Sequence, residues 1–307
     1  MSAPSVEEMV ERLRRIPDEV RDYGCDARCA QLQLGLDAAQ LERIVSAGVP
    51  TVEADGEPRF EYGDLYYIAM RLGCATTFLW AARQWADSLE TFAGRPQTDV
   101  SIRYVPQLAA AGAVDGVVHL PDGEQRTMEL INGRVAVEAH VVMRGPWPQP
   151  PPEAHAVLEQ VDRRLTFYEL PKRWQGDTTL ARRSGFSDCV TSAHVIVEDC
   201  LAIGVEARVN TGFFVSQPYS VTHGWAEVRA DGEWVPVDPL MLAVMREFGG
   251  LDASRWPPRR SIGPMVSPVV AMTDTVMVID GVDVEATLLT TIDEQAAALR
   301  SERSAHG

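Results

Sequence analysis

Alternating hydrophobic and polar positions between residues 220 and 240 predict a β-hairpin. In the sequence SVTHGWAEVRADGEWVPVDPL, the pair Asp231-Gly232 accepts positive φ and lies between two runs of strand-forming residues. If this pair forms a two-residue loop, residues directly opposite share a face, and so do residues two apart along each strand. One face of the hairpin is then apolar and consists of Ala226, Val228, Val235 and Val237.

The opposite face of the hairpin carries residues that can do chemistry. The same register places Trp225 opposite Asp238, which makes His223 and Asp238 diagonal neighbours with Cα atoms roughly 7–8 Å apart. A register slip of one residue would place the two side chains on opposite faces. The pattern therefore predicts an imidazole held by a carboxylate, on a face shared with Glu227 and Trp234.

Periodic hydrophobic positions predict further elements on both sides of this hairpin. Helical patterns cover 5–22, 37–47, 61–92 with a break near Gly73, 153–164, and Cys189 to Gly204. Strand patterns cover 99–105, 116–121, 126–131, 134–143, 205–215, 221–230 and 233–239. The tail has another hairpin pattern at 275–289, followed by a polar helical end. Helices mixed with antiparallel strands indicate an α+β protein.

The most proline-rich stretch, RGPWPQPPPE at 144–153, predicts a domain boundary. A chain of 307 residues is also long for one domain. We therefore expect an N-terminal region, 1–148, of helices and a β-meander with no assigned role. The second region, 149–307, would contain the hairpin and the helix that begins at Cys189.

Charge and composition narrow the possible partners and the location. The formal net charge is −16 and no basic run is sustained, so neither nucleic acid nor an anionic membrane is expected as a partner. The N-terminus lacks the apolar core of a signal peptide, and the apolar stretch 65–82 contains Arg71, which favours a buried helix over a membrane span. Five cysteines, an odd number, then indicate a reducing cytoplasm in which none need form a disulfide.

Cys189 is the candidate nucleophile that would form a catalytic triad with the histidine and aspartate of the hairpin. It lies where a polar loop enters an apolar helix, with Ser187 or Asp188 as the expected N-cap. The positive end of a helix dipole favours the thiolate form of a cysteine in the first turn. A thiol next to an imidazole is a common nucleophile system. His194, five residues further along the same helix, would point away from the cysteine.

The other cysteines and histidines have structural interpretations. Cys200 lies three turns further along the apolar helix and is expected in the core, and Cys74 is expected to be buried in its helix. Cys25 and Cys29 could be half of a zinc site, but no second pair follows at suitable spacing, so neither a metal nor another cofactor is expected. The predicted strands of the N-terminal region carry two further histidines, His119 and His140.

The stretch from about 175 to 245 resembles the transglutaminase-like superfamily of papain-like cysteine enzymes. The resemblance is carried by a cysteine that opens a helix, GVEAR at 204–208, HGWAE at 223–227, and the strand from Trp234 to Pro239. It implies a papain-like core, in which a helix that begins with the cysteine packs on an antiparallel sheet that carries histidine and aspartate. One departure is that Phe186, Ser187 and Asp188 separate Gly185 from the cysteine, where the family often has glycine next to it.

Roles for individual residues follow from this resemblance. Cys189 would attack an acyl carbonyl, His223 would accept and return the proton, and Asp238 would orient the imidazole. The backbone N–H of Cys189 would stabilise the oxyanion, with a second donor from the Trp174-Gln175 segment. Trp225 would be a wall of the site or a packing residue, and Asp188 a helix cap.

The resemblance implies acyl transfer through a thioester, with the acceptor left open. Transfer to an amine would form an amide bond, in some members of the superfamily from a carrier-protein thioester in a biosynthetic pathway. Transfer to water would make the protein a peptidase or amidase. A third hypothesis is a non-catalytic binding or assembly module in which Cys189 is a structural helix residue. We expect the amine acceptor, because the large N-terminal region suggests a dedicated enzyme rather than a general protease.

Overall fold

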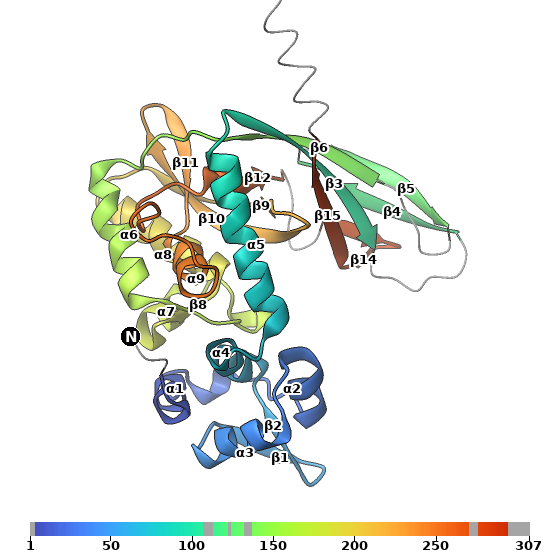
Figure 1. The fold of residues 1–307 in the computed structure, drawn as a ribbon, viewed down its shortest axis with the longest axis vertical. Coiled ribbons are helices and arrows are strands. Elements are labelled where there is room, and N and C mark those ends of the chain that lie inside the picture. Colours follow the sequence, from blue (N-terminus) through green and yellow to red (C-terminus); the bar gives the residue numbers. More distant parts are fainter. Residues whose placement is uncertain (1–3, 107–112, 122–123, 132–136, 270–275, 294–307) are drawn as a thin grey trace, which may run out of the picture.

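A seven-stranded sheet crosses the upper part of the computed structural model, which describes residues 4–106, 113–121, 124–131, 137–269 and 276–293 (Figure 1). Its strands follow the order β12-β9-β10-β15-β3-β6, and β11 pairs with β10. All of the pairings are antiparallel. The strands are β3 (Gln97–Pro106), β6 (Val137–Arg144), β9 (Ala207–Phe214), β10 (Tyr219–Ala230), β11 (Glu233–Val237), β12 (Val266–Pro268) and β15 (Ala286–Ile292).

The hairpin of β10 and β11 has the predicted register. Ala230 pairs with Glu233 and Val228 with Val235, so the loop consists of two residues. Asp231 and Gly232 have φ values of 48° and 83°, the positive φ that a tight right-twisted hairpin requires at both loop positions. The two-residue loop is thus confirmed, and with it the division of the hairpin into an apolar and a polar face.

Helices cover both faces of this sheet. On one face, the apolar side of the hairpin joins α6 (Pro152–Arg164) and α8 (Cys189–Ala202) in a hydrophobic core. The long helix α5 (Thr76–Ala93) contributes Trp85, whose ring meets that of Phe214 on β9 at 5.8 Å. Both α6 and α8 match the helices predicted there, because their apolar positions repeat at helical spacing.

A helix that the sequence analysis missed follows the hairpin. The strand predicted to 239 ends at Val237, and α9 (Pro239–Phe248) begins two residues later. Asp238 is the N-cap of α9 and accepts a hydrogen bond from the backbone N–H of Met241 at 2.9 Å. Proline at the first helical position fits this start, because its missing N–H would have no intrahelical partner.

The N-terminal helices form the lower part of the molecule in Figure 1. The helix predicted at 5–22 is wrong in its length, since α1 (Val6–Leu13) ends before Pro17 and a short turn, η1 (Asp18–Val20), follows. The helical pattern at 61–92 is indeed divided, and Gly73 ends its first half with a φ of 77°. The remaining elements are α2 (Ala27–Leu34), α3 (Ala38–Ser46), β1 (Thr51–Ala54), β2 (Glu57–Phe60) and α4 (Tyr62–Leu72).

Two cysteine predictions in this region are wrong. Cys25 and Cys29 form a disulfide, although no bridge was expected among the five cysteines. The turn between them brings their Cα atoms to 5.4 Å, within the range that a disulfide can span. Cys74 lies half-buried in the loop between α4 and α5 rather than in a helix, and the side-chain amide of Gln40 donates to its sulfur at 2.9 Å.

The predicted meander is divided between two sheets, because its third strand, β6, pairs with β3 in the large sheet. A smaller four-stranded sheet contains the first two strands of the meander, together with β13 and β14 from the C-terminal segment. Its order is β14-β13-β4-β5, with bounds β4 (Ala113–His119), β5 (Gln125–Ile131), β13 (Met277–Ile279) and β14 (Val282–Asp283). The polar helical end predicted after 289 lies mostly outside the described residues, which end at 293. Strands from both sides of residue 148 pair in both sheets, and the division at 148 stays a prediction.

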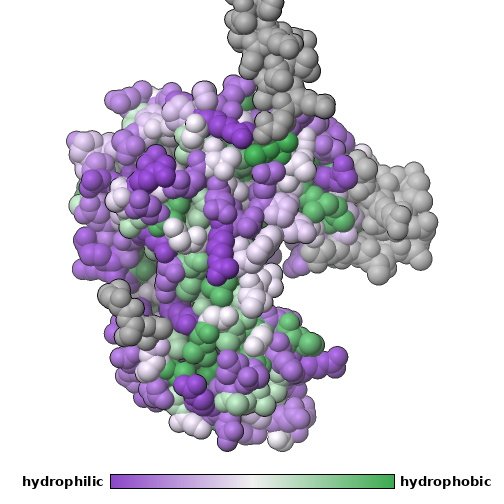
Figure 2. Space-filling view, in the orientation of Figure 1, coloured by the Kyte–Doolittle hydropathy of each residue, from purple (hydrophilic) through white to green (hydrophobic). Residues whose placement is uncertain are grey.

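Hydrophilic residues cover most of the face seen in Figure 2. Hydrophobic residues gather on it mainly over the N-terminal helices, near the bottom of the view. In the described ranges, no helix combines the length and the apolar character needed to cross a bilayer.

Candidate active site

Cys189 is the first residue of α8, as the sequence predicts. Asp188 adopts an extended conformation and caps the helix, since its Oδ1 accepts a hydrogen bond from the N–H of Thr191 at 2.7 Å. Ser187 is not the cap, because its hydroxyl donates to the carbonyl of Asp188. Cys189 is a free, half-buried cysteine. The cap therefore fixes the point at which the thiol enters the positive end of the helix.

His223 and Asp238 are in direct contact, as their shared face predicts. Nε2 of His223 lies 2.8 Å from Oδ2 of Asp238, and both side chains are buried. Burial alone would lower the pKa of the imidazole, but the charge on Cys189 and hydrogen bonds with Asp238 and Cys189 outweigh it. Together these interactions raise the pKa of His223 to about 10. The structure therefore brings the three side chains together.

An interruption in the pairing of β10 makes room for this arrangement. The ladder with β11 ends at Ala226, and the ladder with β15 covers only Tyr219 and Ser220. Between these ladders, β10 has β9 on one edge and no paired strand on the other among the described residues. His223 lies in this interval. The first turn of α8 approaches here, since a Cβ added at Gly224 would lie 3.0 Å from Val190.

Aromatic rings and a buried carboxylate surround the imidazole. The ring centroid of Phe214 lies 4.7 Å from that of His223, and the ring of Trp225 is nearly parallel to the imidazole, with its centroid at 6.3 Å. Trp225 is fully buried, and its indole N–H donates to Glu227 at 3.4 Å. Arg208 and Asn210 also donate to the Glu227 carboxylate. This packing restricts the rotation of the imidazole and makes Trp225 a residue of the wall around it.

The Trp174-Gln175 segment lies next to the first turn of α8. Trp174 ends the short turn η2 (Lys172–Trp174) and Gln175 follows it; the next N–H, of Gly176, donates to Oγ1 of Thr191 at 2.8 Å. The indole nitrogen of Trp174 is buried and has no hydrogen-bond partner among the described residues. The side chain of Gln175 instead reaches the carbonyl of Leu170 at 3.5 Å. An unsatisfied indole N–H is thus available in this segment.

Glu169 is a residue near the site that sequence reasoning missed. It follows the short strand β7 (Thr166–Phe167), which pairs in parallel with β8 (Phe186–Ser187), the strand that leads to Asp188. Burial, and then the charge of Asp188, raises the pKa of Glu169, and burial also raises the pKa of Asp188. The sequence carries no signal for this pair, because the two carboxylates meet only through strand pairing.

The competing cysteine and histidines take no part in the contacts that join Cys189, His223 and Asp238. Cys200 is fully buried in the core under α8, where burial and then Asp199 raise the pKa of its thiol to about 11. His194 is exposed on α8. The ring of His140 forms a hydrogen bond of 2.8 Å with Ser101 on the neighbouring strand. In the described part of the chain, no three or more histidine, cysteine or acidic side chains are grouped as metal ligands.

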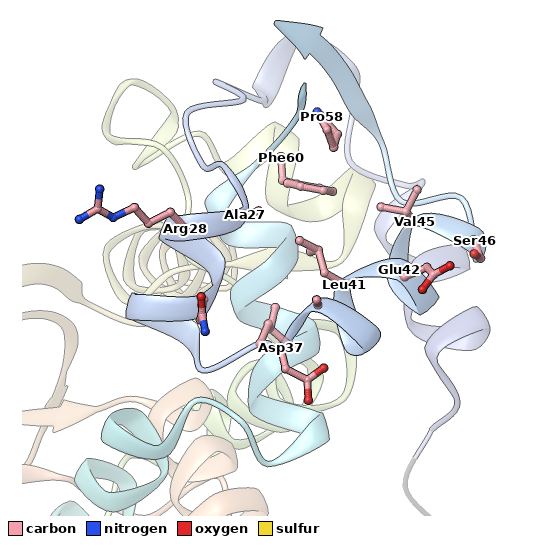
Figure 3. Close-up of a pocket in the computed structure, with 12 residues that line it drawn as sticks. Ala27, Arg28, Asp37, Leu41, Glu42, Val45, Ser46, Pro58 and Phe60 are labelled. Atoms are coloured by element: carbon pink, nitrogen blue, oxygen red, sulfur yellow. The ribbon is translucent and has the colours of Figure 1, made fainter. Parts of the chain in front are cut away.

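A separate pocket of about 500 Å³ lies in the N-terminal region, between α2, α3 and β2 (Figure 3). Leu41 and Phe60 point into it, and Arg28, Asp37 and Glu42 lie around its rim. Cys189, His223 and Asp238 are not among the residues that line it.

Residues 143–239 match the family model of the transglutaminase-like superfamily. This segment is transglutaminase-like. It contains Cys189, His223 and Asp238 and ends one residue after Asp238. The comparison with curated proteins gives no match. One solved structure, named "The Crystal Structure of a Putative Cysteine Protease from Cytophaga hutchinsonii", is 12% identical, with a TM-score of 0.33, over 64% of this chain and 89% of that one.

The transglutaminase-like segment does not include every strand that surrounds the site. Strand β15, which pairs with β10 at Tyr219 and Ser220, comes after the segment, and β3, which pairs with β15, comes before it. Helices α1 to α5 also precede the segment.

Proposed function

We propose that this protein is a cysteine acyltransferase, which forms a thioester on Cys189 and passes the acyl group to an amine. The observation that carries the proposal is the position of His223, which interacts with Cys189 at the start of α8 and with Asp238 at the start of α9. All three residues lie within the transglutaminase-like segment. A nucleophile, a base and a residue that orients the base are the minimum set for this type of catalysis.

The proposed reaction has two half-reactions. The thiolate of Cys189 attacks the acyl carbonyl, and the imidazolium of His223 then gives its proton to the leaving group as the thioester forms. In the second half-reaction, neutral His223 accepts a proton from the incoming amine, which attacks the thioester and releases the thiolate. Asp238 holds the imidazole in one orientation and stabilises its cation throughout.

The N–H groups at the start of α8 favour the negative oxygen that forms in each half-reaction. The first N–H groups of a helix have no intrahelical acceptor, so that of Cys189 is suited to an oxyanion. The indole N–H of Trp174, buried and without a partner among the described residues, supports Trp174 as the second donor.

Hydrolysis is the alternative outcome, because the same three residues serve either acceptor. Water in place of the amine would make the protein a peptidase or amidase. The enclosure of His223 by Phe214, Trp225 and Asp238 supports the amine, since a buried base has few neighbouring waters to activate. The acyl donor in either case would be a peptide, an amide or a carrier-protein thioester.

Intact-protein mass spectrometry tests the proposal. The protein would be incubated with acyl-pantetheine thioesters and with activated esters, each in the presence and absence of a primary amine. We expect an acyl adduct on the native protein and on Cys200→Ala, none on Cys189→Ala, and faster loss of the adduct with the amine than with water alone. Equal adducts on all three proteins would show that Cys189 is not the nucleophile, and a rate of adduct loss that does not depend on the amine would favour hydrolysis.

A further inference from the structure

The N-terminal helices, here α1 and α4 together with the turn η1 and the residues that follow it, contact both chain segments that hold the first turn of α8. One segment consists of the parallel strands β7 and β8, and the second of these leads directly to Asp188 and Cys189. The other is η2, which leads to Gly176 and its hydrogen bond with Thr191. Figure 1 shows α4 immediately below β8 and α7 (Thr178–Ser184). Both segments therefore lie between α8 and the N-terminal region.

The contact with β7 and β8 is a buried polar network. Asp64 on α4 accepts hydrogen bonds from Nε of Arg21 at 2.7 Å and from the hydroxyl of Tyr168 at 2.9 Å. The Arg21 guanidinium also donates to the carbonyls of Leu13 and Ile16. All three side chains of the network are buried, and the N–H of Tyr168 donates to the carbonyl of Ser187 on β8. A fully hydrogen-bonded buried network of this kind holds its members in one arrangement.

Close packing at the start of α4 adds to this network. A Cβ added at Gly63 would lie 2.5 Å from the carbonyl oxygen of Glu169 and 2.6 Å from the ring of Tyr168. Arg12 on α1 donates to the hydroxyl of Thr166 at 2.7 Å, at the start of β7. The N-terminal helices therefore hold β7 at its first residue and directly after its end.

The contact with η2 depends on Arg173. Its guanidinium pairs with Asp22 and donates to the carbonyls of Glu19, Val20 and Arg21, at 3.3 to 3.5 Å. Arg173 precedes Trp174, and Gly176 follows two residues later. Any movement of η2 would therefore move the segment that is bonded to the first turn of α8.

We infer that the N-terminal helices act as a clamp on the active site, and that Arg173 and Asp64 are positioning residues for Cys189. His223 and Asp238 come from the opposite side, on β10 and the start of α9, so the clamp sets the distance between the two halves of the site. The inference rests on the proposed function, in which that distance matters. A displacement of about 1 Å can slow an enzyme by up to about a hundredfold.

The test compares Arg173→Ala with Arg173→Lys and with Arg259→Ala. Arg259 is a matched control, because it forms an exposed ion pair with Glu159 on α6, away from η2. The measurement is the rate at which iodoacetamide alkylates Cys189, followed by peptide mass spectrometry across a range of pH, together with the thermal midpoint. This probe needs no knowledge of the substrate.

We expect Arg173→Ala to slow alkylation about tenfold and to change its pH profile, Arg173→Lys to restore most of the rate, and Arg259→Ala to match the native protein. The thermal midpoints of all three should stay close together, because exposed ion pairs contribute little to stability. Asp64→Asn should slow alkylation as well where it folds. Equal rates for Arg173→Ala and Arg259→Ala would overturn the inference, whereas a native Cys189 no faster than a free thiol would overturn the proposed function instead.

Discussion

Asp238 joins His223 to the start of a helix. Its Oδ2 lies 2.8 Å from Nε2 of His223, while its Oδ1 accepts the N–H of Met241 in the first turn of α9. One carboxylate therefore orients the imidazole and caps the helix that follows the hairpin. The rigid helix fixes the carboxylate, and the carboxylate in turn fixes the ring.

The two roles of Asp238 can be separated by substitution. In Asp238→Asn, the amide can still cap α9 but carries no charge for the imidazolium, so acyl-enzyme formation should slow by about 10²- to 10⁴-fold with little loss of stability. In Asp238→Ala, the cap is lost as well, and the free energy of unfolding should fall by about 1 kcal/mol or more. Acylation rates and urea unfolding measure the two effects. An Asp238→Asn variant that acylates at the native rate would show that the charge is not needed.

The pKa of His223 predicts how stability changes with pH. Burial alone would lower this pKa, but Cys189 and Asp238 raise it to about 10, against about 6.5 for a free histidine. A raised pKa means that the folded protein holds the proton more tightly than the unfolded chain does. The stabilisation of the folded protein by His223 is therefore complete below about pH 6.5 and is lost as the pH rises through about 10.

Urea unfolding of the native protein and of His223→Gln, from about pH 6 to about pH 10, measures this contribution. The stability difference between the two proteins should shrink steadily as the pH rises, since other titrating groups are common to both. In Cys189→Ala the decline should be weaker, because one cause of the raised pKa is absent. A difference that stays constant over this range would contradict the assigned pKa.

The hairpin could be predicted from the sequence because two local residues, Asp231 and Gly232, set its register. The N-cap at Asp188 is equally local, and the helix that begins at Cys189 follows from it. The start of α9 was missed because the alternation of Val235 and Val237 also continues a strand pattern to 239. The Asp-Pro pair that ends this pattern is itself a helix-start signal.

The clamp contacts could not be predicted from sequence patterns. Asp64 and Tyr168 are 104 residues apart; Asp64 lies in an ordinary helical pattern, and Tyr168 lies in a segment with no predicted helix or strand. Which helix packs on which strand depends on the tertiary fold, and one sequence does not reveal it. The same reason applies to Glu169 and Asp188, which meet through the pairing of β7 and β8.

The Cys25–Cys29 disulfide predicts a specific count of free thiols. Without reduction, the denatured chain should take up three maleimide labels, on Cys74, Cys189 and Cys200, and after reduction it should take up five. The disulfide closes only a short loop, so its reduction should lower the free energy of unfolding by about 2 kcal/mol. The double variant Cys25→Ser/Cys29→Ser should keep the native alkylation rate at Cys189. Five labels without reduction would show that the bond is absent.

Gly224 allows the first turn of α8 to approach β10. A Cβ at this position would lie 3.0 Å from Cγ2 of Val190 and 3.5 Å from its Cα, so Gly224→Ala should push the start of α8 away from the strand. Cys189 would then lie further from His223. We expect acyl-enzyme formation to slow about tenfold, with a loss of stability of about 1 kcal/mol.

Truncating the side chain of Val190 should reverse the effect of Gly224→Ala on acylation. In the double variant Gly224→Ala/Val190→Ala, the Cγ2 atom is absent, and the strand and helix can approach again. Acylation should recover most of the native rate, while Val190→Ala alone, the matched control, should change it little. If the double variant stays as slow as Gly224→Ala, the contact between residues 190 and 224 does not set the position of Cys189. Recovery would show that the reactivity of the thiol depends on how closely α8 approaches β10 at this one position.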